Sequence, residues 1–254
     1  MSSLEVAATI FGCLMLGALA GMRLRVILPK HHLDSDTRDV VKLGVGLIGT
    51  MSALVLGLLV ASTKGSYDLK KTELAQLAGN AILLDRVLAH YGPEAADIRE
   101  HLRAAIRALA GGDRSKDPLE QLARAAPINR EVIFDKIQGL VPHTDVERSL
   151  QAEAKSLAVT LGQTRWLLFA QSGTSISAPF LFIVVFWLTV LYLSFGLFAP
   201  ANGTALTTLL ISAVSVAAAM FLILDLDHPF TGLMQIPDTP LRNALAVLGE
   251  RAEQ

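Results

Sequence analysis

The chain has 254 residues, of which 52% are hydrophobic and only 18% are charged. An ordinary soluble domain carries roughly 25% charged residues, and long stretches of this chain have none, so a purely soluble fold is excluded. The 22 basic residues balance 23 acidic ones, which excludes a strongly basic nucleic-acid-binding protein.

Four apolar segments are long enough to cross a bilayer, which takes about 20 residues of helix. They run from about residue 6 to 22, 43 to 62, 179 to 198 and 204 to 224. The first could be taken for a secretory signal, but Glu5 replaces its basic start, and Arg23 and Arg25 stand where the cleavage site would lie. We therefore expect four retained membrane-spanning helices.

The polar region between the second and third spans has helical periodicity. Its apolar residues alternate at spacings of three and four in two long seams, which we expect to pack as antiparallel partners. The first seam is Leu74, Leu77, Ala81, Leu84, Leu88 and Tyr91, and the second is Leu150, Ala154, Leu157, Leu161, Thr164 and Leu168. The sequence thus predicts an all-α protein in four parts: residues 1–62 with two spans, a soluble helical insert over 63–177, two more spans over 178–225, and a polar C-terminal tail over 226–254.

The second span carries a small residue at every fourth position. We call Gly49, Ala53, Gly57 and Ala61 the small-residue ribbon. Helices in lipid associate mainly through close packing, which small residues permit. The first span has a matching pair in Gly17 and Gly21.

Two interpretations of this ribbon stay open. In the simpler one, the first and second spans pack on each other within one chain. In the functional one, the ribbon packs tightly while the opposite face lines an axial constriction in an oligomer; that face consists of Ile48, Met51, Val55 and Leu59.

Two carboxylates, Asp225 and Asp227, follow the fourth span, where the dipole of a helix C-terminus disfavours negative charge. We expect them to be compensated, either by a salt bridge to Arg165 or Lys64 or by a bound hard cation such as Ca²⁺ or Na⁺. Apart from this ion, no cofactor is expected.

No other pattern points to chemistry. The adjacent His31 and His32 could bind a transition metal, but neighbours in sequence do not face a common point, which favours a solvated loop. The sequence has no nucleophile elbow, phosphate loop, paired acid–base site or zinc spacing, so we do not expect an enzyme.

Three stretches together resemble the bestrophin-like family of bacterial integral membrane proteins, which is distantly similar to bestrophin ion channels. They are residues 39–44 running into 53–62, residues 84–86 with 90–95 and 102–103, and residues 224–233. The resemblance implies a homo-oligomer, with a pentamer favoured, four spans embedded in lipid, a second span lining a narrow neck, and a calcium-binding acidic stretch after the fourth span. Two departures are the absence of phenylalanine from the second span and the reduction of the acidic stretch to Asp225 and Asp227.

The preferred hypothesis is therefore an oligomeric ion channel or pore whose second span lines the constriction. The alternative is a non-conducting membrane scaffold or sensor whose helical insert binds a partner. Basic residues near the membrane are almost evenly divided between the two sides, so the positive-inside rule decides little. From the resemblance we expect a bacterial inner membrane protein with its insert and both termini in the cytoplasm.

Overall fold

The computed structural model describes residues 2–29, 34–110, 132–170, 176–200, 202–230 and 232–250. These ranges contain helices and connecting segments and no strand. His31 and His32, and the helix that the sequence suggests between the prolines at 118 and 127, lie outside the described residues. The all-α prediction is confirmed.

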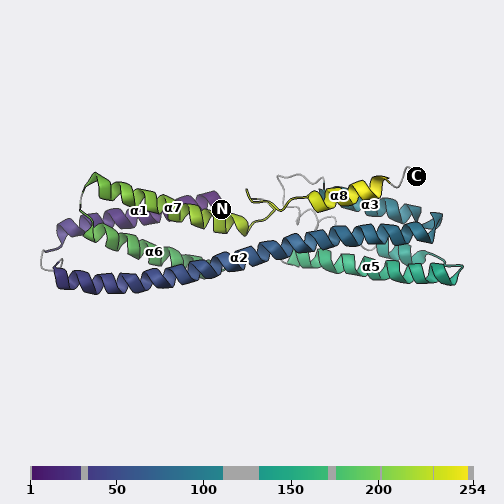
Figure 1. The fold of residues 1–254 in the computed structure, drawn as a ribbon, viewed down its shortest axis with the longest axis horizontal. Helices are drawn as coiled ribbons and strands as arrows, with labels where there is room; N and C mark the ends of the chain where they lie inside the picture. The colour runs from purple at the N-terminus through teal and green to yellow at the C-terminus, as the bar shows by residue number, and fades with distance from the viewer. Residues whose placement is uncertain are drawn as a thin grey trace. The chain divides into compact units, whose positions relative to one another are not determined.

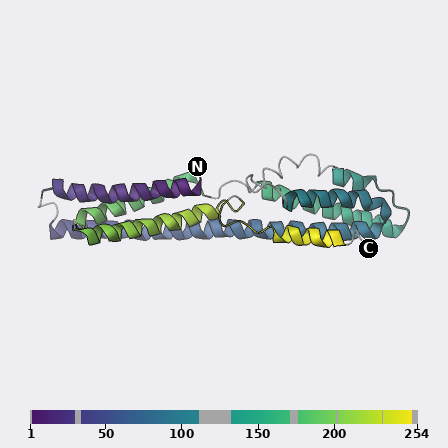
Figure 2. The same cartoon turned by 90° about the horizontal axis from the view of Figure 1, so that it is seen from above.

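The chain divides into two compact units (Figures 1 and 2). The membrane unit comprises Met1–Ser66 and Thr174–His228, and the polar unit comprises Tyr67–Gly173 and Pro229–Gln254. One helix, α2 (Ser35–Tyr91), contributes to both units and has 57 residues. The second span and the first apolar seam are thus parts of one helix.

The membrane unit contains α1 (Ser3–Ile27), the first part of α2, α6 (Ala178–Phe198) and α7 (Gly203–Leu226). Each of these four helices is long and apolar enough to cross a membrane, as predicted. In Figures 1 and 2, α1, α6 and α7 lie alongside the first part of α2. Their shared core consists of Ile10, Leu14, Ala18, Leu59, Val184, Leu188, Leu191, Tyr192, Leu209, Ala213, Met220 and Ile223.

Local hydrogen bonds explain where two of the spans begin. Ser2 Oγ accepts the backbone N–H of Glu5 at 3.2 Å, and the Glu5 carboxylate accepts the backbone N–H of Ser2 at 2.9 Å, which is a complete capping box for α1. At α7, the Asn202 side chain accepts the backbone N–H of Ala205 at 2.9 Å. Glu5, unusual for a secretory signal, therefore has a structural role.

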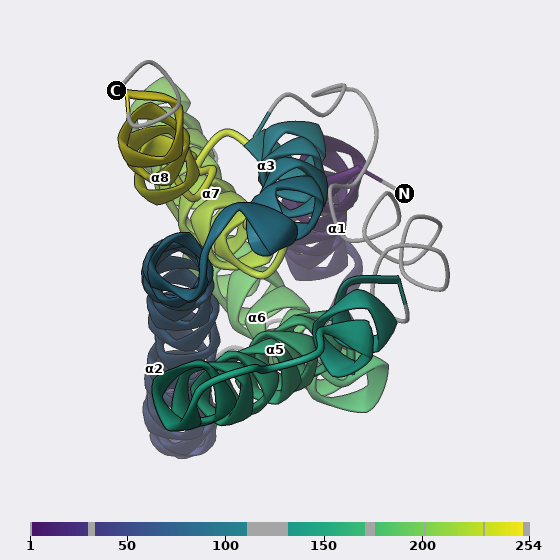
Figure 3. The ribbon, with the colours of Figure 1, turned by 90° about the vertical axis from the view of Figure 1, so that its right-hand side faces the viewer.

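The polar unit contains the second part of α2, the short η2 (Pro93–Ala95), α3 (Ala96–Ala110), α5 (Asp145–Ala170) and α8 (Thr239–Glu250), with a further helical stretch over 132–139. Figure 3 shows these helices with the right-hand side of Figure 1 turned toward the viewer. Gly92 ends α2 with φ of +133°, a backbone conformation that favours glycine.

Both predicted seams lie in the core of the polar unit. All six residues of the first seam are buried. In the second, Ala154, Thr164 and Leu168 are buried, and Leu150, Leu157 and Leu161 are partly buried. The C-terminal region differs from the expected polar tail because α8 adds Leu241, Ala244 and Leu248 to this core. Their spacing of three and four places them on one face of a helix.

A buried ion pair joins α2 to α3 in the polar unit. Arg99 forms a bidentate pair with Asp85, donating from Nε to Oδ1 at 2.8 Å and from Nη2 to Oδ2 at 2.9 Å. Arg103 Nη2 lies 3.8 Å from the same Oδ1. Asp85 is only 3% exposed. Its hydrogen bonds raise the pKa of Arg99. One carboxylate therefore compensates two guanidinium groups.

We expect Asp85→Asn to lower the free energy of unfolding by about 3 kcal/mol, because it leaves both guanidinium groups without a counter-charge. Chemical unfolding in mild detergent measures this loss. The matched control is Asp145→Asn, which removes a carboxylate that is 95% exposed and pairs with Arg148. It should change the stability by about 0.5 kcal/mol or less. Equal losses in the two variants would show that the buried pair has no special role.

Candidate ion-conduction site

Within the membrane unit, one face of α2 packs against the other helices of the same chain. Ser52 and Leu59 on this face are 2% and 7% exposed, and Thr63 is fully buried. Val45, Ile48, Val55 and Leu56 are partly buried against the core of the membrane unit. Because these residues recur at spacings of three and four, they form one stripe along the helix, which we call the own-chain face.

The opposite face of α2 is uncovered. Leu43 is 76% exposed and Leu54 is 75% exposed, and Leu47 between them is 63% exposed. Only 11% of the apolar window of α2 is buried, against 33% in each of the other three spans. We call Leu43, Leu47, Thr50, Leu54, Gly57 and Ala61 the open face. In a membrane, it must meet lipid, another copy of the chain, or a pore.

Three of the four predicted pore-lining residues lie on the own-chain face of α2. Ile48, Val55 and Leu59 contact their own core, and only Met51 is exposed, at 43%. The structure differs from the sequence expectation because nearly every side chain of the second span is apolar or small. Its pattern therefore could not indicate which face the other spans cover.

The small-residue ribbon lies at the edge of the own-chain face and beyond it. A Cβ atom on Gly49 would meet only Leu191 Cδ2, at 3.8 Å, and one on Gly57 would meet nothing within 4 Å. Ala53 and Ala61 are exposed. The ribbon thus has free space beside it at Gly57, and its role in assembly stays a prediction.

The small residues of α1 pack against α6 rather than the second span. A Cβ on Gly17 would lie 2.9 Å from the Thr189 carbonyl oxygen, and one on Gly21 would collide with the Leu193 carbonyl oxygen. From the other side, a Cβ on Gly196 would collide with the Ala18 carbonyl oxygen. The two backbones approach so closely that these positions require glycine.

The two carboxylates after the fourth span are buried. Asp225 is 3% exposed and Asp227, the residue that caps the C-terminus of α7, is 5% exposed. Both have interaction partners, as do Arg165 and Lys64. Among the described residues, no three or more His, Cys, Asp or Glu side chains gather in a way that could hold a metal ion. Salt bridging and ion binding at these aspartates both stay predictions.

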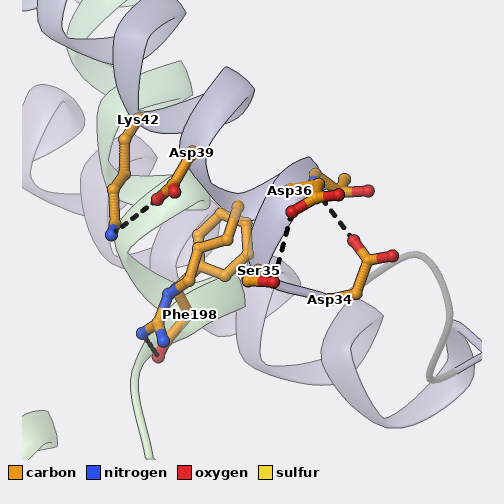
Figure 4. A network of polar contacts seen from close by, with 8 residues as sticks. Asp34, Ser35, Asp36, Asp39, Lys42 and Phe198 are labelled. Atoms are coloured by element: carbon orange, nitrogen blue, oxygen red, sulfur yellow. Dashed lines mark hydrogen bonds and ion pairs between the residues drawn. The ribbon is translucent and has the colours of Figure 1, made fainter.

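Cations from two other helices lie at the C-terminal end of α6, which has no basic residue in its last turn. Arg25 donates to the Ala199 carbonyl, and Arg38 donates to the Phe198 carbonyl at 3.5 Å with its guanidinium carbon 5.5 Å from the centre of the Phe198 ring. They satisfy carbonyls that the helix itself leaves free. Figure 4 shows this end of the membrane unit, where Lys42 also pairs with Asp39 at 3.1 Å.

A family model for the bestrophin-like domain matches residues 12–241. The chain belongs to the bestrophin-like family. The resemblance inferred from the three sequence stretches is thereby confirmed, and with it an integral membrane protein. Family membership supports a channel-type function rather than an enzyme. No curated protein matches the chain.

Crystal structures of a bacterial bestrophin homologue from Klebsiella pneumoniae, each of a different single-residue mutant, share the fold. One matches with a TM-score of 0.66 at 15% sequence identity, covering 97% of this chain and 100% of that one. A second gives 0.64 at 15% identity over 96% and 99% of the two chains, and a third 0.63 at 16% over 97% and 100%. At these identities, the likeness supports the four-span, all-α fold.

Replacing Gly21 with alanine should destabilise the membrane unit by about 1–3 kcal/mol, because the new methyl group has no space beside the Leu193 carbonyl. The matched control is Gly12→Ala on the same helix, where a Cβ meets nothing within 4 Å. Alanine should cost nothing there, since it favours helix more than glycine does. Thermal unfolding of both variants in the same detergent checks this, and a similar melting temperature for the two would contradict the close crossing.

Proposed function

We propose that the protein is an oligomeric membrane channel for small ions, in which several copies surround an axis lined by the open face of α2. The observation that carries the proposal is the low burial of the α2 window, 11% against 33% for its neighbours. Family membership supports the channel class. The proposal retains the second span as the lining element but moves the lining from the own-chain face to the open face.

The chemistry of the open face suits an apolar constriction. Leu43, Leu47 and Leu54 provide apolar side chains, while Thr50 provides a hydroxyl. From Leu43 to Ala61 the face extends for 18 residues, which is about 27 Å of helix and close to the thickness of the hydrocarbon layer. Apolar constrictions of this kind control conduction by excluding water.

The small side chains of the open face set how closely copies of α2 could approach. Gly57 and Ala61 come one turn apart, toward the end of the second span. Small residues at such positions let neighbouring helices pack backbone to backbone. We therefore place the closest approach between neighbouring copies of α2 at these residues.

For the remaining features the proposal follows the family. The assembly is a pentamer in the lipid of a bacterial inner membrane, with the polar unit and both termini on the cytoplasmic side. The orientation is taken from the family, since basic residues are almost evenly divided between the two sides of the membrane.

Cysteine accessibility tests the lining face. In a Cys13→Ala background, Leu54→Cys should react with a charged, water-soluble thiol reagent, and the reaction should reduce the conductance of the protein in planar bilayers. The reason is that Leu54 is 75% exposed on the face proposed to meet the axis.

The matched control for this experiment is Ile48→Cys, six residues from Leu54 and packed on the membrane core. The reagent should leave its conductance unchanged. An effect at residue 48 with none at residue 54 would restore the face predicted from the sequence. A purified monomer that conducts no ions in the absence of reagent would instead favour the non-conducting scaffold.

Gly57→Leu should weaken assembly without unfolding the chain. Within one chain a new side chain at residue 57 has free space, but between chains it would separate the helices and remove packing worth on the order of 1–3 kcal/mol. The oligomeric mass in mild detergent should fall. Val55→Leu, on the own-chain face, is the control and should keep the wild-type mass; an unchanged mass for Gly57→Leu would remove the ribbon from the interface.

A further inference from the structure

A groove of about 770 Å³ lies at the end of the membrane unit where α2 and α7 begin and α6 ends. Its walls are mostly apolar and come from all three helices, with Val45 on α2, Leu191 and Phe195 on α6, and Leu209 on α7. The proposed conduction path does not use these residues, since Val45 lies on the own-chain face of α2 and the other three belong to α6 and α7.

Glycine keeps the α2 wall of this groove open. A Cβ on Gly46 would meet nothing within 4 Å, and one on Gly49 would meet only the Leu191 side chain. From Lys42 to Gly49 the wall extends for seven residues, about 10 Å of helix. This is most of the depth of one leaflet of the hydrocarbon layer, which is about 15 Å.

Two cations lie at one end of the groove. Arg38 and Lys42 both line it, and both are exposed. The contact of Arg38 with Phe198 holds the guanidinium beside the groove. Among the described residues, Lys42 pairs with Asp39 in a contact in which both side chains are more than half exposed, and such pairs contribute little. The first turn of α7, with Thr204 and Ala205, lines the same end and adds the positive end of a helix dipole.

We propose that this groove binds an anionic phospholipid, with its phosphate at Arg38 and Lys42 and one acyl chain along Gly46 and Gly49. The cations provide charge complementarity to a phosphate, and the apolar walls favour an acyl chain over a water-soluble anion. The groove lies at the end of apolar membrane-spanning helices. A lipid bound there would place its headgroup among the cations at the membrane surface and its acyl chain against the apolar walls. A lipid bound there would contact α2, α6 and α7 together.

Native mass spectrometry and thermal unfolding of the full chain in detergent test this site with three additives. They are phosphatidylglycerol, phosphatidylcholine with the same acyl chains, and glycerol phosphate. Phosphatidylglycerol should bind and raise the melting temperature, since a ligand of the folded state stabilises it. The other two additives should have little effect.

The double variant Arg38→Gln/Lys42→Gln should bind phosphatidylglycerol about 10-fold to 30-fold more weakly, since each basic group near a membrane surface contributes to anionic lipid binding. Its matched control, Arg148→Gln/Arg242→Gln, removes two exposed, ion-paired cations from the polar unit and should bind like the wild type. Gly46→Leu keeps both cations and fills the groove, and it should weaken binding to a similar degree even if the charge variant is unstable.

Three results would overturn the proposal. Equal binding of the anionic and zwitterionic lipids would show that the cations do not select the headgroup. If glycerol phosphate raised the melting temperature as much as phosphatidylglycerol does, the groove would be a site for a soluble anion instead. An altered oligomeric mass for Gly46→Leu, with no lipid bound to the wild type, would show that another copy of the chain fills the groove. Bilayer conductance is not part of this test, so its outcome is separate from that of the proposed channel function.

Discussion

The close crossing of α1 and α6 is the contact on which the rest of the membrane unit depends. Gly17 and Gly21 on α1, with Gly196 on α6, bring the two backbones together without intervening side chains. This crossing determines which side of α6 turns toward α2, where Leu191 meets Gly49. The face of α2 that is covered, and hence the face that stays open, therefore follows from glycines on two other helices.

The two parts of α2 are stabilised by different forces although they belong to one helix. In the polar unit, the hydrophobic effect drives the apolar seam from Leu74 to Tyr91 into a core. In the membrane unit, lipid is as apolar as leucine, so packing has to come from close contact of small residues and shape. A single helix thus has an apolar stripe in one part and apolar residues on all sides in the other.

This difference explains how much of the fold could be predicted. The four spans and both seams followed from hydropathy and spacing, because each depends on segments near one another in the sequence. The orientation of the second span depends on α6, more than 100 residues away, and an apolar helix has no polar face to reveal it. Local patterns likewise did not indicate the Asp85–Arg99 pair or the attachment of α8, since each joins residues of separate helices.

The candidate site was predicted only in part for the same reason. The spacing of Gly17 and Gly21 was enough to predict that α1 packs closely on another helix. Their partner on α6 was not predicted, because Gly196 is the single glycine of its span and forms no repeating pattern of small residues. The basic end of the membrane unit was also missed. Arg25 and Arg38 lie outside the predicted spans, and only the three-dimensional structure places them on the last carbonyls of α6.

The contacts of Arg25 and Arg38 also affect how the spans can move. Because α6 takes its C-terminal cations from α1 and α2, three helix ends are tied together at Phe198 and Ala199. Separating them would leave carbonyl groups without donors next to a membrane, which is costly. Rocking of these helices would therefore have its pivot at this end, and the largest displacements would occur at the opposite end of the spans.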